Sequence, residues 1–63
     1  MKITKANFTR AMNEHDLGKR KAKLQSIALG IGHHGGIWQA ARDEIERLNA
    51  AGVKTPLEKA MGI

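Results

Sequence analysis

Residues 37–49, IWQAARDEIERLN, carry the clearest helical pattern in the chain. Their apolar side chains recur at steps of three, four and three, on one face of a helix: Trp38, Ala41, Ile45 and Leu48. Ile37 widens that face, and Gly52 follows as the expected C-terminal glycine cap. The stretch therefore predicts a helix with one buried face.

The two helices expected before this one have clear start signals. Thr4 is the expected N-cap of the first helix, with Ile3 and Phe8 at the spacing of a hydrophobic staple. Asp16 is the expected N-cap of the second helix. Because Gly18 disfavours a helix interior by about 1 kcal/mol, we expect a break or kink near residues 15–18.

Residues 55–58, TPLE, predict a short fourth helix. Thr55 caps it, Pro56 takes its first position and Glu58 completes a capping box. Strand-forming residues are scarce elsewhere in the chain. The predicted fold is all-α: one helical domain over residues 1–63, a small bundle of three helices plus a short C-terminal helix.

A chain of 63 residues buries only about 60% of the surface that it exposes when unfolded, so its core is small. We expect four large apolar residues to anchor this core: Trp38, Phe8, Ile45 and Leu48. The indole of Trp38 should make the largest single contribution.

The stretch GIGHHGG, residues 30–36, reads literally as G-x-G-x-x-G. A dinucleotide site needs this motif between a strand and a helix, whereas helical patterns flank it here on both sides. A metal site needs about four ligands, and adjacent His33 and His34 point in different directions on regular structure. We therefore expect neither a metal nor a cofactor. The prediction is a turn between two helices made by Gly30, Gly32, His33, His34, Gly35 and Gly36.

The net charge of +5 is placed unevenly. The excess lies within residues 1–23, whereas residues 24–63 are neutral. Four basic residues, here called the basic cluster, follow Asp16: Lys19, Arg20, Lys21 and Lys23. Positive charge near a helix N-terminus opposes the helix dipole. We therefore expect the basic cluster and Arg10 to contact phosphates or an acidic partner, and to contribute to binding more than to stability.

The two helices around Gly32 partly resemble the helix-turn-helix family of DNA-binding proteins. Apolar or small residues stand at the positions that this family buries: Ile27, Ala28 and Ile31 before the turn, Trp38 and Ala41 after it. His33 stands where the family has an apolar residue, and Gly35 and Gly36 stand where side chains would read bases. The resemblance implies a small DNA-binding protein.

In size, charge and lack of cysteine the whole chain resembles the small accessory and regulatory proteins of temperate phages, such as those of lambdoid phages. This resemblance implies a non-enzymatic protein that binds a host or phage protein, and it transfers no functional residue. DNA binding is the alternative, and a homodimer is also compatible with the sequence.

Catalysis is not expected, because cysteine is absent and Ser26 lies in an apolar run. No catalytic residue is assigned. The N-terminal residues lack the apolar run of a signal peptide, and the longest apolar stretch is too short to cross a bilayer. We therefore expect a cytoplasmic protein without a membrane partner.

Overall fold

The computed structural model describes residues 2–30 and 35–62. In these ranges the chain forms four helices and no strand: α1 (Lys5–Met12), α2 (Leu17–Ala28), α3 (Gly35–Ala50) and α4 (Pro56–Met61). The predicted all-α bundle of three helices and a short C-terminal helix is confirmed. Of the predicted turn, Gly32, His33 and His34 lie outside the described residues, whereas Gly35 and Gly36 are the first residues of α3.

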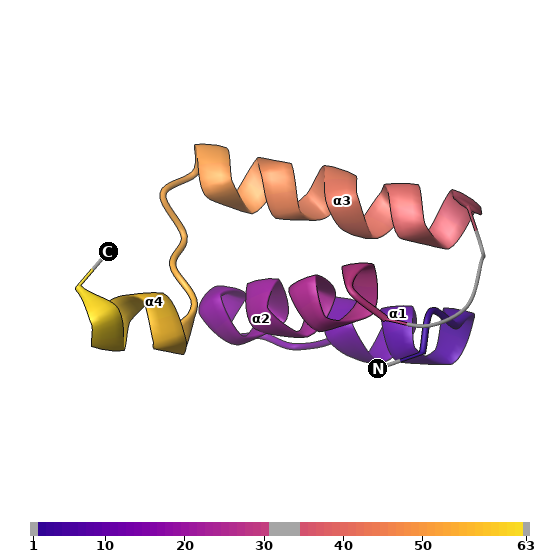
Figure 1. Cartoon of the computed structure of the whole chain (residues 1–63), viewed down its shortest axis with the longest axis horizontal. Coiled ribbons are helices and arrows are strands. Elements are labelled where there is room, and N and C mark those ends of the chain that lie inside the picture. The colour runs from indigo at the N-terminus through magenta and orange to yellow at the C-terminus, as the bar shows by residue number, and fades with distance from the viewer. Residues whose placement is uncertain (1, 31–34, 63) are drawn as a thin grey trace.

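The helices form an elongated bundle (Figure 1). α2 and α3 run antiparallel and share the most extensive interface. α1 packs against both of them, and α4 touches α2 near the point where α2 begins. A helix-turn-helix unit joins its helices at about 90–120°. The α2–α3 pair instead forms an antiparallel helical hairpin (Figure 1).

The predicted N-caps are all confirmed. Thr4 Oγ1 accepts a hydrogen bond from the Asn7 N–H (3.1 Å). Asp16 Oδ1 accepts one from the Lys19 N–H (3.2 Å). At α4 the capping box is complete: the Glu58 N–H donates to Thr55 Oγ1 (3.1 Å), and the Thr55 N–H donates to Glu58 Oε1 (2.9 Å). Each cap satisfies N–H groups that a helix start would otherwise leave unpaired.

The end of α3 is also as expected. Gly52 has a φ of +78°, the left-handed conformation that glycine adopts without strain. Its N–H donates to the Asn49 carbonyl (3.0 Å), and the Val53 N–H donates to the Leu48 carbonyl (3.0 Å). This is the Schellman pattern, and it turns Val53 back onto the core.

The break between α1 and α2 lies at residues 13–16, slightly before the expected place. Gly18 is not part of the break: it is buried in the first turn of α2. A Cβ atom there would lie 2.5 Å from the Lys54 carbonyl oxygen. Gly18 therefore serves a close approach between α2 and the segment that leads into α4.

This contact makes Gly18 sensitive to a single methyl group. We expect Gly18→Ala to destabilise the fold by about 1–3 kcal/mol, although alanine is the better helix former. Gly36→Ala is the matched control, because nothing lies within 4 Å of its Cβ position, and it should be neutral or stabilising by up to about 1 kcal/mol. Urea unfolding followed by circular dichroism measures both. Equal stability of the two variants would contradict the close approach.

The core joins the first three helices and the segment before α1. Six apolar residues are buried: Ile3, Ala11, Leu24, Ile27, Ala41 and Leu48. Five partly buried apolar residues pack around them: Phe8, Met12, Ile37, Ile45 and Val53. Of the expected anchors, Leu48 is therefore central, and Phe8 and Ile45 flank the core.

The expectation for Trp38 is wrong. Its side chain is 37% exposed and is not among the residues that pack against the core. The face of α3 that packs against the core contains Ile37, Ala41 and Leu48. The side chain of Trp38 lies beside this face and not at its centre. Trp38 therefore lies at the rim of the α2–α3 interface.

Candidate functional site

The structure contradicts the role expected for Lys21 in the basic cluster. The residue is only 3% exposed. Its Nζ donates hydrogen bonds to the Val53 carbonyl oxygen (3.0 Å) and to Glu58 Oε1 (2.9 Å). A buried ammonium group held in this way cannot also contact a phosphate or an acidic partner. Lys21 instead ties α2 to α4 and to the segment before it.

Two further members of the basic cluster are also engaged within the chain. Arg20 donates to the Glu14 carbonyl oxygen from Nε (3.1 Å) and Nη2 (3.0 Å), and to Glu44 Oε2 from Nη1 (3.3 Å). Lys23 Nζ donates to Glu14 Oε2 (2.8 Å). Among the described residues, exposed Lys19 and Arg10 form no ion pair. Of the expected five-residue contact surface, Lys19 and Arg10 are therefore exposed without an ion pair in the described ranges, and Lys23 is exposed within one.

The carboxylates of these ion pairs have lowered pKa values. Hydrogen bonds from the Thr55 backbone and then from Lys21 lower the pKa of Glu58 from 4.5 to about 2. The hydrogen bond from Lys23 lowers the pKa of Glu14, and that from Arg47 lowers the pKa of Glu44. All three groups are therefore ionised at neutral pH and balance positive charge of the basic cluster.

The ion pair within α3 joins residues three positions apart and not four. Arg47 Nε and Nη2 each lie 2.6 Å from an oxygen of Glu44, three residues earlier. Glu44 itself is only 10% exposed and faces Arg20. Arg42 lies over the ring of Trp38, with its Cζ 5.3 Å from the ring centroid. Arg42 is thus held against an aromatic ring and forms no ion pair within the described ranges.

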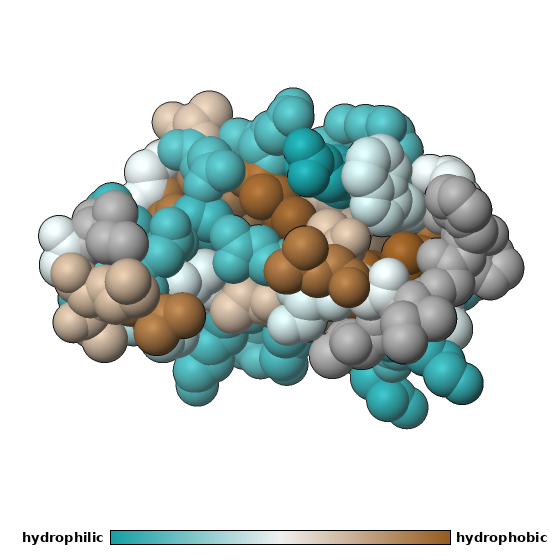
Figure 2. Space-filling model, viewed as in Figure 1, coloured by the Kyte–Doolittle hydropathy of each residue, from teal (hydrophilic) through white to brown (hydrophobic). Residues whose placement is uncertain are grey.

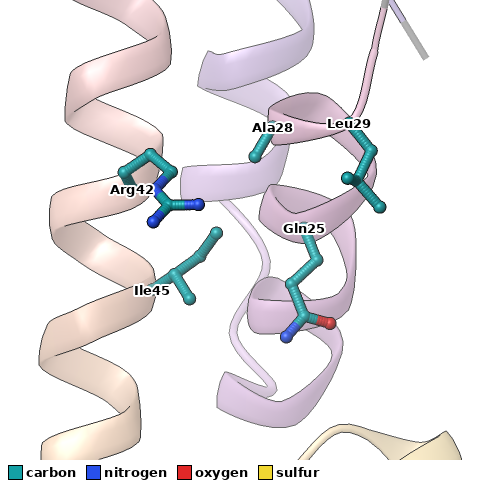
Figure 3. Close-up of a pocket in the computed structure, with 5 residues that line it drawn as sticks. All are labelled: Gln25, Ala28, Leu29, Arg42 and Ile45. Carbon is teal, nitrogen blue, oxygen red and sulfur yellow. The ribbon is translucent and has the colours of Figure 1, made fainter.

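A shallow pocket lies between α2 and α3 (Figure 3). Its volume is about 280 Å³, and five residues line it, here called the α2–α3 pocket: Gln25, Ala28, Leu29, Arg42 and Ile45. The side chains of Arg42 and Ile45 point from α3 toward α2 (Figure 3). Leu29, the C-cap residue of α2, is 88% exposed. The pocket is therefore bordered by a large apolar side chain that nothing in the described chain covers.

Trp38 extends this surface along α3. Its Nε1–H donates to the Ala28 carbonyl oxygen (3.3 Å), close to the point where α2 ends. Figure 2 shows apolar surface between hydrophilic rims in the middle of one face, between the rows of α2 and α3. An exposed leucine and a half-exposed indole beside one pocket are typical of a partner surface, in which aromatic anchors are frequent.

A second apolar surface lies on α4, where Leu57 is 69% exposed and Met61 is 63% exposed. Neither residue lines the α2–α3 pocket. Single exposed apolar residues are common on protein surfaces. Leu57 therefore provides a matched comparison for Leu29.

Potential metal ligands do not gather in the described part of the chain. Within residues 2–30 and 35–62 no group of three metal-ligating side chains occurs, and His15 is exposed. His33 and His34 lie outside these ranges, so the prediction that they bind no metal stays a prediction. Ser26 lies on α2 and is exposed. Among the described helices, none is both long enough and apolar enough to span a bilayer.

Comparison of the chain with models of protein families, with curated proteins and with solved structures gave no match.

The sequence contained a signal for the misassigned Lys21. Lys21 precedes Leu24 by three residues and Ala28 by seven, so it lies on the apolar stripe of α2. Glu44 lies in the same way between Ala41 and Leu48 on α3. A charged residue on an apolar stripe indicates a paired, buried charge. Leu29 had no comparable signal, because its exposure depends on where α2 ends.

Proposed function

We propose that the chain is a small non-enzymatic regulatory or interaction protein that binds another protein through the α2–α3 pocket and Trp38. The exposure of Leu29 beside this pocket carries the proposal, because this large apolar residue is 88% exposed to water. Covering such a side chain together with an indole contributes favourably to association. The pocket is shallow and small, which suits a side chain of a protein partner better than a drug-sized ligand.

Protein binding is favoured over DNA binding by the distribution of charge. Most of the basic cluster is engaged with Glu14, Glu44 and Glu58. Exposed residues of α3 outside the lining of the α2–α3 pocket include Asp43 and Glu46, which repel the continuous phosphate backbone of DNA laid along this helix. α3 also begins with two glycines, which offer no side chain for reading bases.

The likeness to small accessory proteins of temperate phages supports a host or phage protein as the partner, and the cytoplasm as the place of action. It rests on size, charge and the lack of cysteine. The likeness supports the proposed class of partner, and the exposed apolar residues beside the α2–α3 pocket support the proposed contact surface.

Truncation of Leu29 tests the proposal. We expect Leu29→Ala to keep the fold, since the side chain is almost fully exposed, and to weaken binding by about 30-fold, as for a binding hot spot of about 2 kcal/mol. The immobilised protein is incubated with nuclease-treated host lysate, and retained proteins are quantified by mass spectrometry. Leu57→Ala, the matched control, should retain the same partner as the wild type.

Three outcomes would contradict this function. The first is equal retention of partners by wild type and Leu29→Ala. The second is a homodimer, seen by light scattering, that Leu29→Ala dissociates, because the partner would then be a second copy of the chain. The third is binding to duplex DNA that falls steeply with salt and does not depend on Leu29, which would favour the DNA-binding alternative.

A further inference from the structure

The α2–α3 pocket combines apolar walls with one cationic group. Ala28, Leu29 and Ile45 supply the apolar walls, and Arg42 supplies a guanidinium group. Gln25 adds a neutral amide, and no carboxylate lines the pocket among the described residues. A ligand that fits these walls therefore has an apolar part and, next to it, an acceptor for the N–H groups of Arg42.

Arg42 is pre-organised for such an acceptor. Its guanidinium lies over the Trp38 ring, with 5.3 Å between Cζ and the ring centroid. Stacking of this kind occupies a face of the guanidinium and leaves the N–H groups at its edge to donate. Glu46, one helical turn away, forms no ion pair with Arg42 in the described structure. A carboxylate from outside can therefore take two parallel hydrogen bonds from Arg42.

The charge of the whole chain favours the same partner. The net charge is +5, and three of its six acidic residues are already bound to basic residues of the chain: Glu14, Glu44 and Glu58. Long-range attraction therefore accelerates encounters with an acidic partner and disfavours a basic one.

The shape of the site indicates how the partner lies. α2 and α3 run side by side (Figure 1), and the pocket between them is lined from both sides (Figure 3). Its volume of about 280 Å³ suits one large apolar side chain. An amphipathic helix laid in such a groove presents residues three and four positions apart on one face. Such a helix can place an apolar side chain and a carboxylate in the site together.

We propose that the partner segment is an acidic amphipathic helix that inserts one large apolar side chain into the α2–α3 pocket and places a neighbouring carboxylate on Arg42. This inference rests on the proposed function, because it specifies the protein that the α2–α3 pocket binds. Trp38 positions the guanidinium, and Leu29 covers the inserted side chain.

Selection from a displayed library of random peptides tests the inference even while the natural partner is unidentified. Selections are run in parallel on the wild type, Leu29→Ala and Leu57→Ala. Peptides that need Leu29 but not Leu57 should combine Leu, Ile, Phe or Met with Asp or Glu within one helical turn.

The strongest such peptide is then synthesised, and its affinity is measured by fluorescence anisotropy. It should bind Arg42→Gln about tenfold more weakly than the wild type, as expected for loss of a charge-assisted contact. Lys59→Gln removes the same charge from exposed Lys59 on α4 and should change the affinity by less than about threefold.

The outcomes separate this inference from the proposed function. Peptides that depend on Leu29 but lack acidic residues, or that bind Arg42→Gln as tightly as the wild type, would overturn the acidic partner and leave the proposed function in place. An equal loss of peptide affinity in Arg42→Gln and Lys59→Gln would show that Arg42 acts only through the net charge. This result would overturn the proposed contact between Arg42 and a carboxylate of the partner. Absence of any peptide that depends on Leu29 would overturn both proposals.

Discussion

Leu24→Ala should leave most of the chain unfolded at room temperature. Leu24 is fully buried in α2 and is among the largest side chains with no exposed surface. Truncating a buried leucine costs about 2–5 kcal/mol, through lost burial and the cavity left behind. A domain of 63 residues without disulfides has a total stability of only a few kcal/mol. Far-UV circular dichroism of the variant should therefore show loss of most helical signal.

Trp38→Ala is the comparison that tests the assignment of the core. It removes a larger side chain than Leu24→Ala but from the rim of the α2–α3 interface, where the indole is 37% exposed. We expect this variant to stay folded and to lose partner binding. Red-shifted, quenchable fluorescence of Trp38 in the wild type would agree with this position. An unfolded Trp38→Ala with a folded Leu24→Ala would restore Trp38 as the centre of the core.

Trp38 shows why apolar spacing alone does not identify the centre of a core. The steps between Trp38, Ala41 and Leu48 fit one helical face, yet so do those between Ile37, Ala41 and Leu48. In the structure Ala41 is fully buried. A small residue at this point allows α2 and α3 to approach closely, which leaves no room for an indole between them. Whether Ile37 or Trp38 lies on the buried face therefore depends on how α2 packs against α3, and not on the sequence of α3 alone.

Features encoded locally could be predicted better than those that depend on distant contacts. The caps at Thr4, Asp16 and Thr55 follow from hydrogen bonds within three residues, and all three are present. The roles of Gly18 and Lys21 depend on Lys54, Val53 and Glu58, more than 30 residues later in the chain. No local pattern places that segment against α2. The α2–α3 pocket likewise depends on the packing of two helices, so it could not be predicted to the same degree as the helices themselves.

Lys21→Ala should lower stability by about 2 kcal/mol, or the melting temperature by about 10 °C. The substitution removes a buried aliphatic stem and leaves the Val53 carbonyl without its hydrogen bond from Nζ. It also releases α4, a helix of 6 residues that is too short to be stable without docking. Thermal unfolding followed by circular dichroism measures the change.

Lys19→Ala is the matched control, two residues earlier on the same helix. Lys19 is exposed and forms no ion pair within the described ranges, so its loss should change stability by less than about 0.5 kcal/mol. A slight gain is also consistent, because the charge lies in the first turn of α2 and opposes the helix dipole. Equal effects of Lys21→Ala and Lys19→Ala on stability would contradict the structural role of Lys21 and would favour the binding role expected from the sequence.

The pH dependence of the difference between wild type and Lys21→Ala identifies the contribution of the contact with Glu58. The folded-state pKa of Glu58 is lowered from 4.5 to about 2, so the stabilisation is complete above about pH 4.5 and is lost as the pH falls toward 2. Protonated Glu58 attracts Lys21 less, whereas the hydrogen bond to the Val53 carbonyl does not depend on this titration. The hydrogen bond from the Thr55 backbone, the larger cause of the lowered pKa of Glu58, is present in both proteins, so only the part that Lys21 causes appears in the difference. The stability difference should therefore be constant near neutral pH and narrow below pH 4.5, as the pH falls toward 2. Because Glu14 and Glu44 titrate in both proteins, their effects cancel in the difference. A gap that stays constant down to pH 2 would assign the whole effect to the Val53 contact and the buried stem of Lys21.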